Sequence, residues 1–172
     1  MRKILVAGIG NLFLCDDGFG VEVARRLAAV PLPDGVTVAD FGIRGIHLAY
    51  EMLDGAYDEI VLVDACPHGG APGSIAVFEA DARAAVQDVM AAADGHALDP
   101  ASVLRFVERL GGYRSRIVVV GCQPAVIDEG MMLSPPVAAA VDEAVRAVMT
   151  LVNQEERLHV PSDSGTDCRL VG

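Results

Sequence analysis

The sequence predicts a single α/β domain, a three-layer α/β/α sandwich built around a mostly parallel sheet. Apolar segments of strand length alternate along the chain with segments of helical periodicity, which is the pattern of this class. The strand-length segments are apolar at nearly every position, as strands buried on both faces are. The 172 residues, 52% of them hydrophobic, suffice to build one such core.

Two strand–helix pairs are predicted in the first third of the chain. Residues 3–9 (KILVAGI) form a nearly continuous apolar run and predict a buried strand. A helix is expected to open at Asp17, because apolar residues recur at helical spacing after it. The second strand is predicted over 36–41 (VTVADF), and the glycine-containing stretch DFGIRG (40–45) leads into the second helix.

The third strand is predicted over 59–65 (EIVLVDA), where the run is apolar until Asp64. A loop rich in glycine and proline follows at 66–73, and residues 74–80 (SIAVFEA) predict a short fourth strand. Parallel neighbours need a long crossover connection. The fourth strand is therefore not expected to run parallel beside the third.

The second half of the chain continues the alternation. An alanine-rich helix is predicted over 81–93, residues 94–100 break it, and another helix is expected over 101–110. The last strand is predicted over 116–121 (RIVVVG), and a helix from 135 to about 153 closes the fold.

The domain is expected to span residues 1–154. Residues 155–172 are polar and lack periodicity, so they predict a flexible tail.

The composition excludes several classes of partner. Thirteen basic and 24 acidic residues give a net charge of −11, which repels nucleic acid and anionic membranes. The N-terminus has no signal-peptide cleavage site, and no stretch is long and apolar enough to cross a membrane. The four cysteines show no CxxC spacing and predict reduced thiols. The sequence therefore favours a cytoplasmic protein, and we expect a monomer.

Two carboxylates are predicted to face one crevice. In open α/β sheets, ligands bind at the carboxyl ends of the strands, where the strand order reverses. Asp17 follows the first strand and Asp64 ends the third. Asp17 alone could be a helix N-cap, and the neighbouring Asp16 is the better candidate for capping or for solvent. Asp64 is costly to bury unless it is paired, hydrogen-bonded or bound to a metal.

Four histidines could add an imidazole to these carboxylates. His47 lies in a predicted helix and His159 in the tail, whereas His68 and His96 follow breaks from which a side chain could reach the crevice. Two carboxylates and one imidazole would suit nickel, zinc or a similar divalent ion with open positions.

Two familiar types of site are each excluded by a single residue position. The glycines of AGIGN suggest dinucleotide binding, but Phe13 stands where the third glycine of GxGxxG is needed. A phosphoacceptor receiver domain would need a lysine after the last strand. This chain has Gly121–Cys122–Gln123 there, and its only lysine is Lys3.

Five motifs in order resemble the endopeptidases that mature nickel–iron hydrogenases. The resemblance covers about residues 3–152. The motifs are GIGNLFLCDDGFGVEVARRL, DFGIRG, VLVDA followed by APGS, the helix-breaking His96, and VVVGCQPA with GMMLSPPV. The resemblance implies a mixed five-stranded sheet in the order 2-1-3-5-4, with strand 4 antiparallel.

The resemblance also implies a function and a site. Such enzymes remove a C-terminal extension from the hydrogenase large-subunit precursor after nickel insertion. The residues that contact the metal fall on Asp17, Asp64 and His96, and nickel is expected to arrive with the substrate rather than stay with the enzyme. Water would attack the scissile amide, activated by Asp17 or Asp64 or by the metal. The alternative is a nonproteolytic nickel-site binder or a hydrogenase assembly chaperone.

Overall fold

The computed structural model describes residues 1–54, 57–80, 100–110, 112 and 115–153. The strands lie within one residue of their predicted ends. They are β1 (Ile4–Ile9), β2 (Val36–Gly42), β3 (Glu59–Ala65), β4 (Ile75–Glu79) and β5 (Arg116–Cys122).

One short 3-10 helix and four α-helices are described in this part of the chain. They are the 3-10 helix η1 (Cys15–Gly18) and the α-helices α1 (Phe19–Ala28), α2 (Gly45–Leu53), α4 (Pro100–Arg109) and α5 (Pro135–Asn153). The helix predicted over 81–93 and the tail predicted over 155–172 lie outside the described residues.

The five strands form one sheet in the order β2-β1-β3-β5-β4. β1 pairs in parallel with both β2 and β3, and β3 pairs in parallel with β5. β4 is antiparallel to β5, so the prediction that it does not run parallel beside β3 is confirmed. The predicted fold class and strand order are also confirmed.

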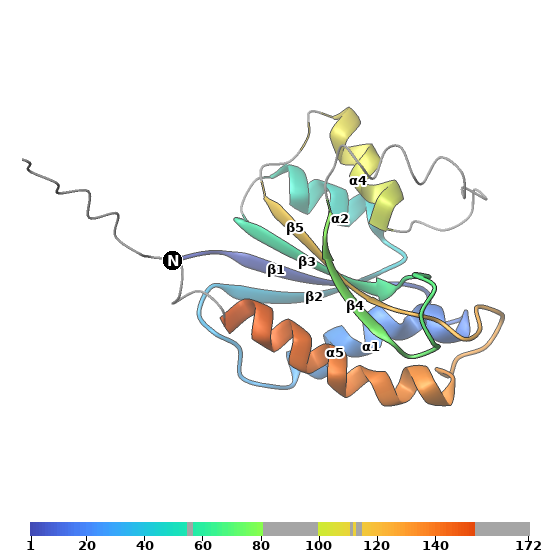
Figure 1. The fold of residues 1–172 in the computed structure, drawn as a ribbon. Helices are drawn as coiled ribbons and strands as arrows, with labels where there is room; N and C mark the ends of the chain where they lie inside the picture. The colour runs from blue at the N-terminus through green and yellow to red at the C-terminus, as the bar shows by residue number, and fades with distance from the viewer. Residues whose placement is uncertain (55–56, 81–99, 111, 113–114, 154–172) are drawn as a thin grey trace, which may run out of the picture.

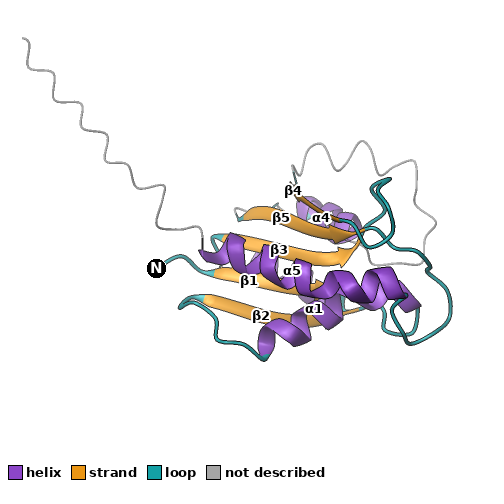
Figure 2. Cartoon of the chain, turned by 60° about the horizontal axis from the view of Figure 1, so that its bottom comes forward, coloured by secondary structure: helices purple, strands orange, loops and turns teal. Residues whose placement is uncertain are grey.

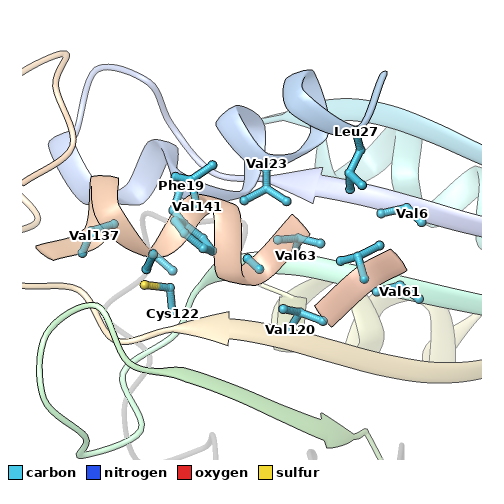
Figure 3. Packing of buried hydrophobic residues seen from close by; sticks show 14 of the residues in the cluster. Val6, Phe19, Val23, Leu27, Val61, Val63, Val120, Cys122, Val137 and Val141 are labelled. Carbon is cyan, nitrogen blue, oxygen red and sulfur yellow. The ribbon is translucent and has the colours of Figure 1, made fainter. Parts of the chain in front are cut away.

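Two helical layers enclose the sheet (Figure 1). α1 and α5 pack on one face, and Figure 2 shows them side by side over the strands. α2 and α4 pack on the other face. Alternation along β3 supplies both cores: Val61 and Val63 face α1 and α5 (Figure 3), whereas Ile60 and Leu62 face α2 and α4.

Close packing of α1 on the sheet requires a glycine. A Cβ at Gly20 would overlap the carbonyl oxygens of Val63 and Ile9, so only glycine lets the helix approach this near. The start of α1 is thereby held against the carboxyl ends of β1 and β3.

The first helix begins later than the sequence indicates. The chain after β1 forms η1, and α1 starts only at Phe19. Gly18 is the N-cap of α1 and makes no side-chain capping bond, so Asp17 does not cap that helix. The difference arises because the Asp17 carboxylate is engaged with an amide that precedes it in the chain.

No helix in the described part of the chain is long and apolar enough to cross a membrane.

Candidate active site

The carboxyl ends of β1 and β3 lie next to each other, because Gly8 pairs with Val63 in the parallel register. Asp17 lies in η1, shortly after β1, and Asp64 is the penultimate residue of β3. η1 also contacts β3 directly. Two acids that are far apart in the sequence thus come to the same edge of the sheet.

Gly10 lies between these two acids. Its φ of +127° is a conformation that side chains rarely allow. A Cβ placed there would overlap the carbonyl oxygen of Asp17 and would lie 3.5 Å from Oδ1 of Asp64. The backbone of Asp17 and the carboxylate of Asp64 therefore approach one point, which a side chain at Gly10 would fill.

The Asp17 carboxylate is half-buried and keeps acceptor capacity. Its Oδ2 accepts a hydrogen bond from the backbone N–H of Asn11 at 2.7 Å. Desolvation raises the pKa of Asp17, and the Asn11 hydrogen bond only partly opposes that rise. A carboxylate with a raised pKa is a better proton acceptor than an ordinary surface aspartate.

Asp64 is almost fully buried, with 5% of its surface exposed. It lies opposite Gly121 in the β3–β5 register. By strand alternation it follows Ile60 and Leu62 on the face that α2 and α4 cover. A buried acid at the end of an apolar strand is the kind of group that functional sites use.

Asp16 has a different role from the one predicted. It is fully buried, so the prediction that its side chain could face solvent is wrong. Its carboxylate accepts hydrogen bonds from the N–H groups of Ala125, Val126 and Ser134 and from the Ser134 hydroxyl, at 2.6 to 2.9 Å. Burial by itself raises the pKa of Asp16, but the bonds from Ser134, Val126 and Ala125 outweigh it and lower that pKa.

Sequence reasoning missed this function of Asp16, because its partners lie more than 100 residues away in the chain. The carboxylate fastens the segment between β5 and α5 to η1, next to Asp17. Asp16 is therefore a structural acid beside a candidate functional one.

Sequence reasoning also misses the structural role of Gln123. Its side-chain oxygen accepts the N–H groups of His68 and Gly69 at 2.7 and 2.9 Å. The backbone N–H of Gln123 donates to Ser74 and its carbonyl accepts from Gly73. The loop that follows Asp64 is thus held against the end of β5, a pairing that no local sequence pattern reveals.

The candidate imidazoles are only partly described. His96 and His159 lie outside the described residues. His47 lies in a helix as predicted, on α2, where it is exposed, and the ring of exposed His68 lies 3.1 Å from the Ser74 carbonyl. Among the described residues, no three histidine, cysteine or acidic side chains are grouped closely enough to hold a metal ion.

Cys122 ends β5 inside the core, where it packs as a small buried hydrophobe. Burial, followed by the nearby charges of Asp16 and Glu143, raises the pKa of its thiol to about 11. This thiol stays protonated at neutral pH. Cys66 is only half-buried.

Comparisons with known proteins all lead to one group. The family model described as hydrogenase maturation protease matches residues 21–151. A putative hydrogenase maturation protease of Methanocaldococcus jannaschii is 33% identical over 151 residues, which are 86% of this chain and 95% of that protein. The hydrogenase 2 maturation protease of Escherichia coli is 26% identical, over 94% of this chain and 98% of its own.

A solved structure shows the same architecture. The hydrogenase maturating endopeptidase HybD from E. coli superimposes with a TM-score of 0.72 at 27% sequence identity. The superposition covers 87% of this chain and 91% of that one. The family match itself contains Asp64 and the position of His96 and begins four residues after Asp17.

Proposed function

This chain belongs to the hydrogenase maturation protease family and is an endopeptidase, and we propose that it removes the C-terminal extension of a nickel-loaded nickel–iron hydrogenase large-subunit precursor. Family membership implies the large-subunit precursor as substrate. It also favours proteolysis over the alternative of a nonproteolytic nickel-site binder or assembly chaperone. The requirement for nickel and the position of the cut are the parts that we propose.

The observation that carries this proposal is the approach of Asp17 and Asp64 beside Gly10. Both acids lie at the carboxyl ends of neighbouring parallel strands, where α/β sheets bind their ligands. We propose that His96 completes the set. Two carboxylates and one imidazole leave coordination positions open, so they would recognise nickel that the precursor already holds. Cleavage would then occur only after nickel has been inserted into the precursor.

The reaction that fits this site is hydrolysis by water. A carboxylate at Asp17 or Asp64 takes a proton from the water as its oxygen attacks the scissile carbonyl carbon. The proton then passes to the leaving amine as the C–N bond breaks. The raised pKa of Asp17 supports a general-base role, because the group accepts protons more readily than an ordinary aspartate does. The metal of the substrate could instead activate the same water.

We further propose that the enzyme acts in the cytoplasm. The net charge of −11 disfavours an anionic membrane surface, and the free thiols of Cys15, Cys66 and Cys122 are typical of a reducing compartment.

The direct test is incubation with large-subunit precursor, with and without nickel. Mass spectrometry should show loss of a C-terminal fragment only from the nickel-loaded form. Binding without any mass loss would favour the nonproteolytic alternative, and equal cleavage of both forms would contradict recognition of nickel.

The origin of the metal needs a second measurement. Three ligands from separate parts of the chain should hold free divalent ions weakly, so protein purified without added metal should contain far less than one ion per chain. Added nickel should bind, and His96→Ala should weaken that binding. One zinc ion per chain that survives a chelator and is needed for cleavage would instead identify a conventional metalloprotease.

A further inference from the structure

Five large apolar side chains are exposed on two loops near the candidate site. Phe13 is 66% exposed, Met131 71% and Met132 82%, and Val126 and Ile127 are also exposed. We call these five residues the apolar loop surface. Phe13 lies between β1 and η1, and the other four lie between β5 and α5, a connection that passes the start of α1 in Figure 1.

Backbone hydrogen bonds join the two loops. Leu14 and Gly130 form an isolated parallel bridge. The N–H of Gly130 donates to the Phe13 carbonyl at 3.0 Å, and the N–H of Cys15 donates to the Gly130 carbonyl at 2.9 Å. Phe13 is therefore held next to the segment that carries the other four side chains.

Asp16 fixes the other end of the same surface. Its carboxylate binds the amides of Ala125, Val126 and Ser134, and its own N–H donates to the Val126 carbonyl at 3.3 Å. A buried carboxylate with four hydrogen bonds thus holds a loop whose apolar side chains point away from the core. Exposed apolar surface that is fixed in this way is typical of a preorganised interface.

The surface adjoins the candidate site and has an acidic component. Asp17 follows Asp16 directly in η1, so a protein docked on these loops would also reach Asp17. Asp128 and Glu129 are exposed between Ile127 and Gly130, and no basic residue occurs between Arg116 and Arg146. A complementary partner presents an apolar patch bordered by lysine or arginine. Methionine side chains adapt to such a patch, because they are flexible and polarisable.

We propose that the apolar loop surface docks the hydrogenase large-subunit precursor beside the bond to be cut, through an apolar patch of the precursor that basic side chains border. The inference rests on the proposed function. It assigns binding to residues that are separate from the acids of the site, so affinity for the precursor and the cleavage step can be changed independently.

The test is the double variant Met131→Gln/Met132→Gln. Both side chains are exposed, so thermal unfolding should be unchanged. The KM for nickel-loaded precursor should rise at least about tenfold, as loss of central interface contacts does, while kcat changes little. The matched control is Val30→Gln/Leu110→Gln, which alters two exposed apolar residues that follow the C-terminal ends of α1 and α4. The control should leave KM unchanged.

Charge is tested separately. Asp128→Asn/Glu129→Gln should raise KM and weaken its dependence on salt, because rim charges act mainly on association. Binding of the precursor to the Asp64→Asn protein, with and without the two methionine changes, measures docking without cleavage.

An unchanged KM in the methionine variant, or an equal rise in the control, would overturn the docking surface while wild-type cleavage still supports the proposed function. A wild-type dimer that the methionine changes dissociate would identify the surface as a contact between copies of this chain, which also overturns the inference. A wild-type protein that cleaves no precursor would refute both proposals together.

Discussion

β3 carries a buried acid near each end, and the residues around these two acids differ between the amino edge of the sheet, where the parallel strands begin, and the carboxyl edge, where they end. At the amino edge, Glu59 is 1% exposed and forms ion pairs with Arg2 and Arg116, the latter at 2.8 Å. At the carboxyl edge, Asp64 lies near Asp17, whose carboxylate accepts one backbone amide and whose pKa is raised by burial. Basic residues of the chain itself neutralise the acid at the amino edge, whereas Asp17 remains able to accept a proton or a ligand.

The difference separates acids that stabilise the fold from acids that serve the reaction. Buried charge is tolerated where the protein supplies the opposite charge. Where it supplies only an amide, the carboxylate keeps a preference for a further partner, and in a protease that partner can be water, a metal or the substrate.

The largest effect is expected for Asp64→Asn. The substitution removes charge at nearly constant volume, so the fold should persist while cleavage falls at least about 100-fold, the range of a lost acid–base group. Precursor cleavage followed by mass spectrometry, together with the far-UV circular dichroism spectrum, measures both. Normal cleavage by the folded variant would show that a carboxylate is not required there.

Glu59→Gln should have the opposite profile. Loss of the buried charge leaves Arg2 and Arg116 without their shared partner. Because both arginines are partly exposed, the expected cost is about 1–3 kcal/mol of unfolding free energy rather than the full cost of a broken buried pair. Urea unfolding measures this loss, and cleavage per folded molecule should stay close to wild type. A stable but inactive Glu59→Gln protein would contradict the assignment of Glu59 to stability rather than to the reaction.

The adjacent pair Asp16 and Asp17 sharpens the comparison within one edge. Asp16 has a lowered pKa, so its contribution to stability is present above the unfolded pKa of about 3.9 and is lost as pH falls through the folded value. Asp17 has a raised pKa, so its ionisation costs stability at neutral pH. At pH 7, Asp16→Asn should therefore destabilise the protein by about 1–3 kcal/mol, whereas Asp17→Asn should not destabilise it.

The pH dependence of unfolding tests whether the charge of Asp16 stabilises the fold. The deficit of Asp16→Asn relative to wild type should shrink as the pH falls below 4, because wild-type Asp16 then loses its own charge. A deficit of constant size from pH 7 to pH 3 would show that shape rather than charge at Asp16 stabilises the loop.

The smallest effect is expected from removal of the residues after Asn153. All of this segment but its first residue lies outside the predicted domain, and it lacks the periodicity of a packed element, so cleavage and stability should be nearly unchanged. Kinetics of the truncated protein provide the measurement. A folded but inactive truncation would show that the segment contributes to substrate binding.

The sequence predicts the sheet well and the details of the site less well, for physical reasons. Continuous apolar runs define β1, β3 and β5, and the short connection after β3 is sufficient to predict that β4 does not run parallel beside β3. The same runs predict where Asp17 and Asp64 lie, because the ends of parallel strands share an edge. Side-chain bonds that cross the fold leave no local signal. Asp16 and its partner Ser134 are one such pair, and Gln123 with the loop after β3 is another.

The conformation of the β1–η1 loop was equally hidden. Asp17 has the residue type and the place of an N-cap, and propensity alone favours that interpretation. Its carboxylate instead turns back to the amide of Asn11, because Gly10 adopts a conformation that brings the Asp17 carbonyl against it. Phe13 excludes a dinucleotide motif in the sequence, but only the structure shows that it is exposed beside Gly130.

The hydrogen bonds of Asp16 also constrain the order in which the protein can fold during its synthesis on the ribosome. Asp16 emerges early, but Ala125, Val126 and Ser134 emerge only when three quarters of the chain has been made. β4 must likewise wait for β5, the one strand with which it pairs. Because synthesis runs from the N-terminus, the nascent chain can build β1, β2 and β3 first while η1 still lacks its anchor. Protease activity is thus a late product of translation, and no N-terminal fragment that ends before Ser134 can hold η1 in its mature position.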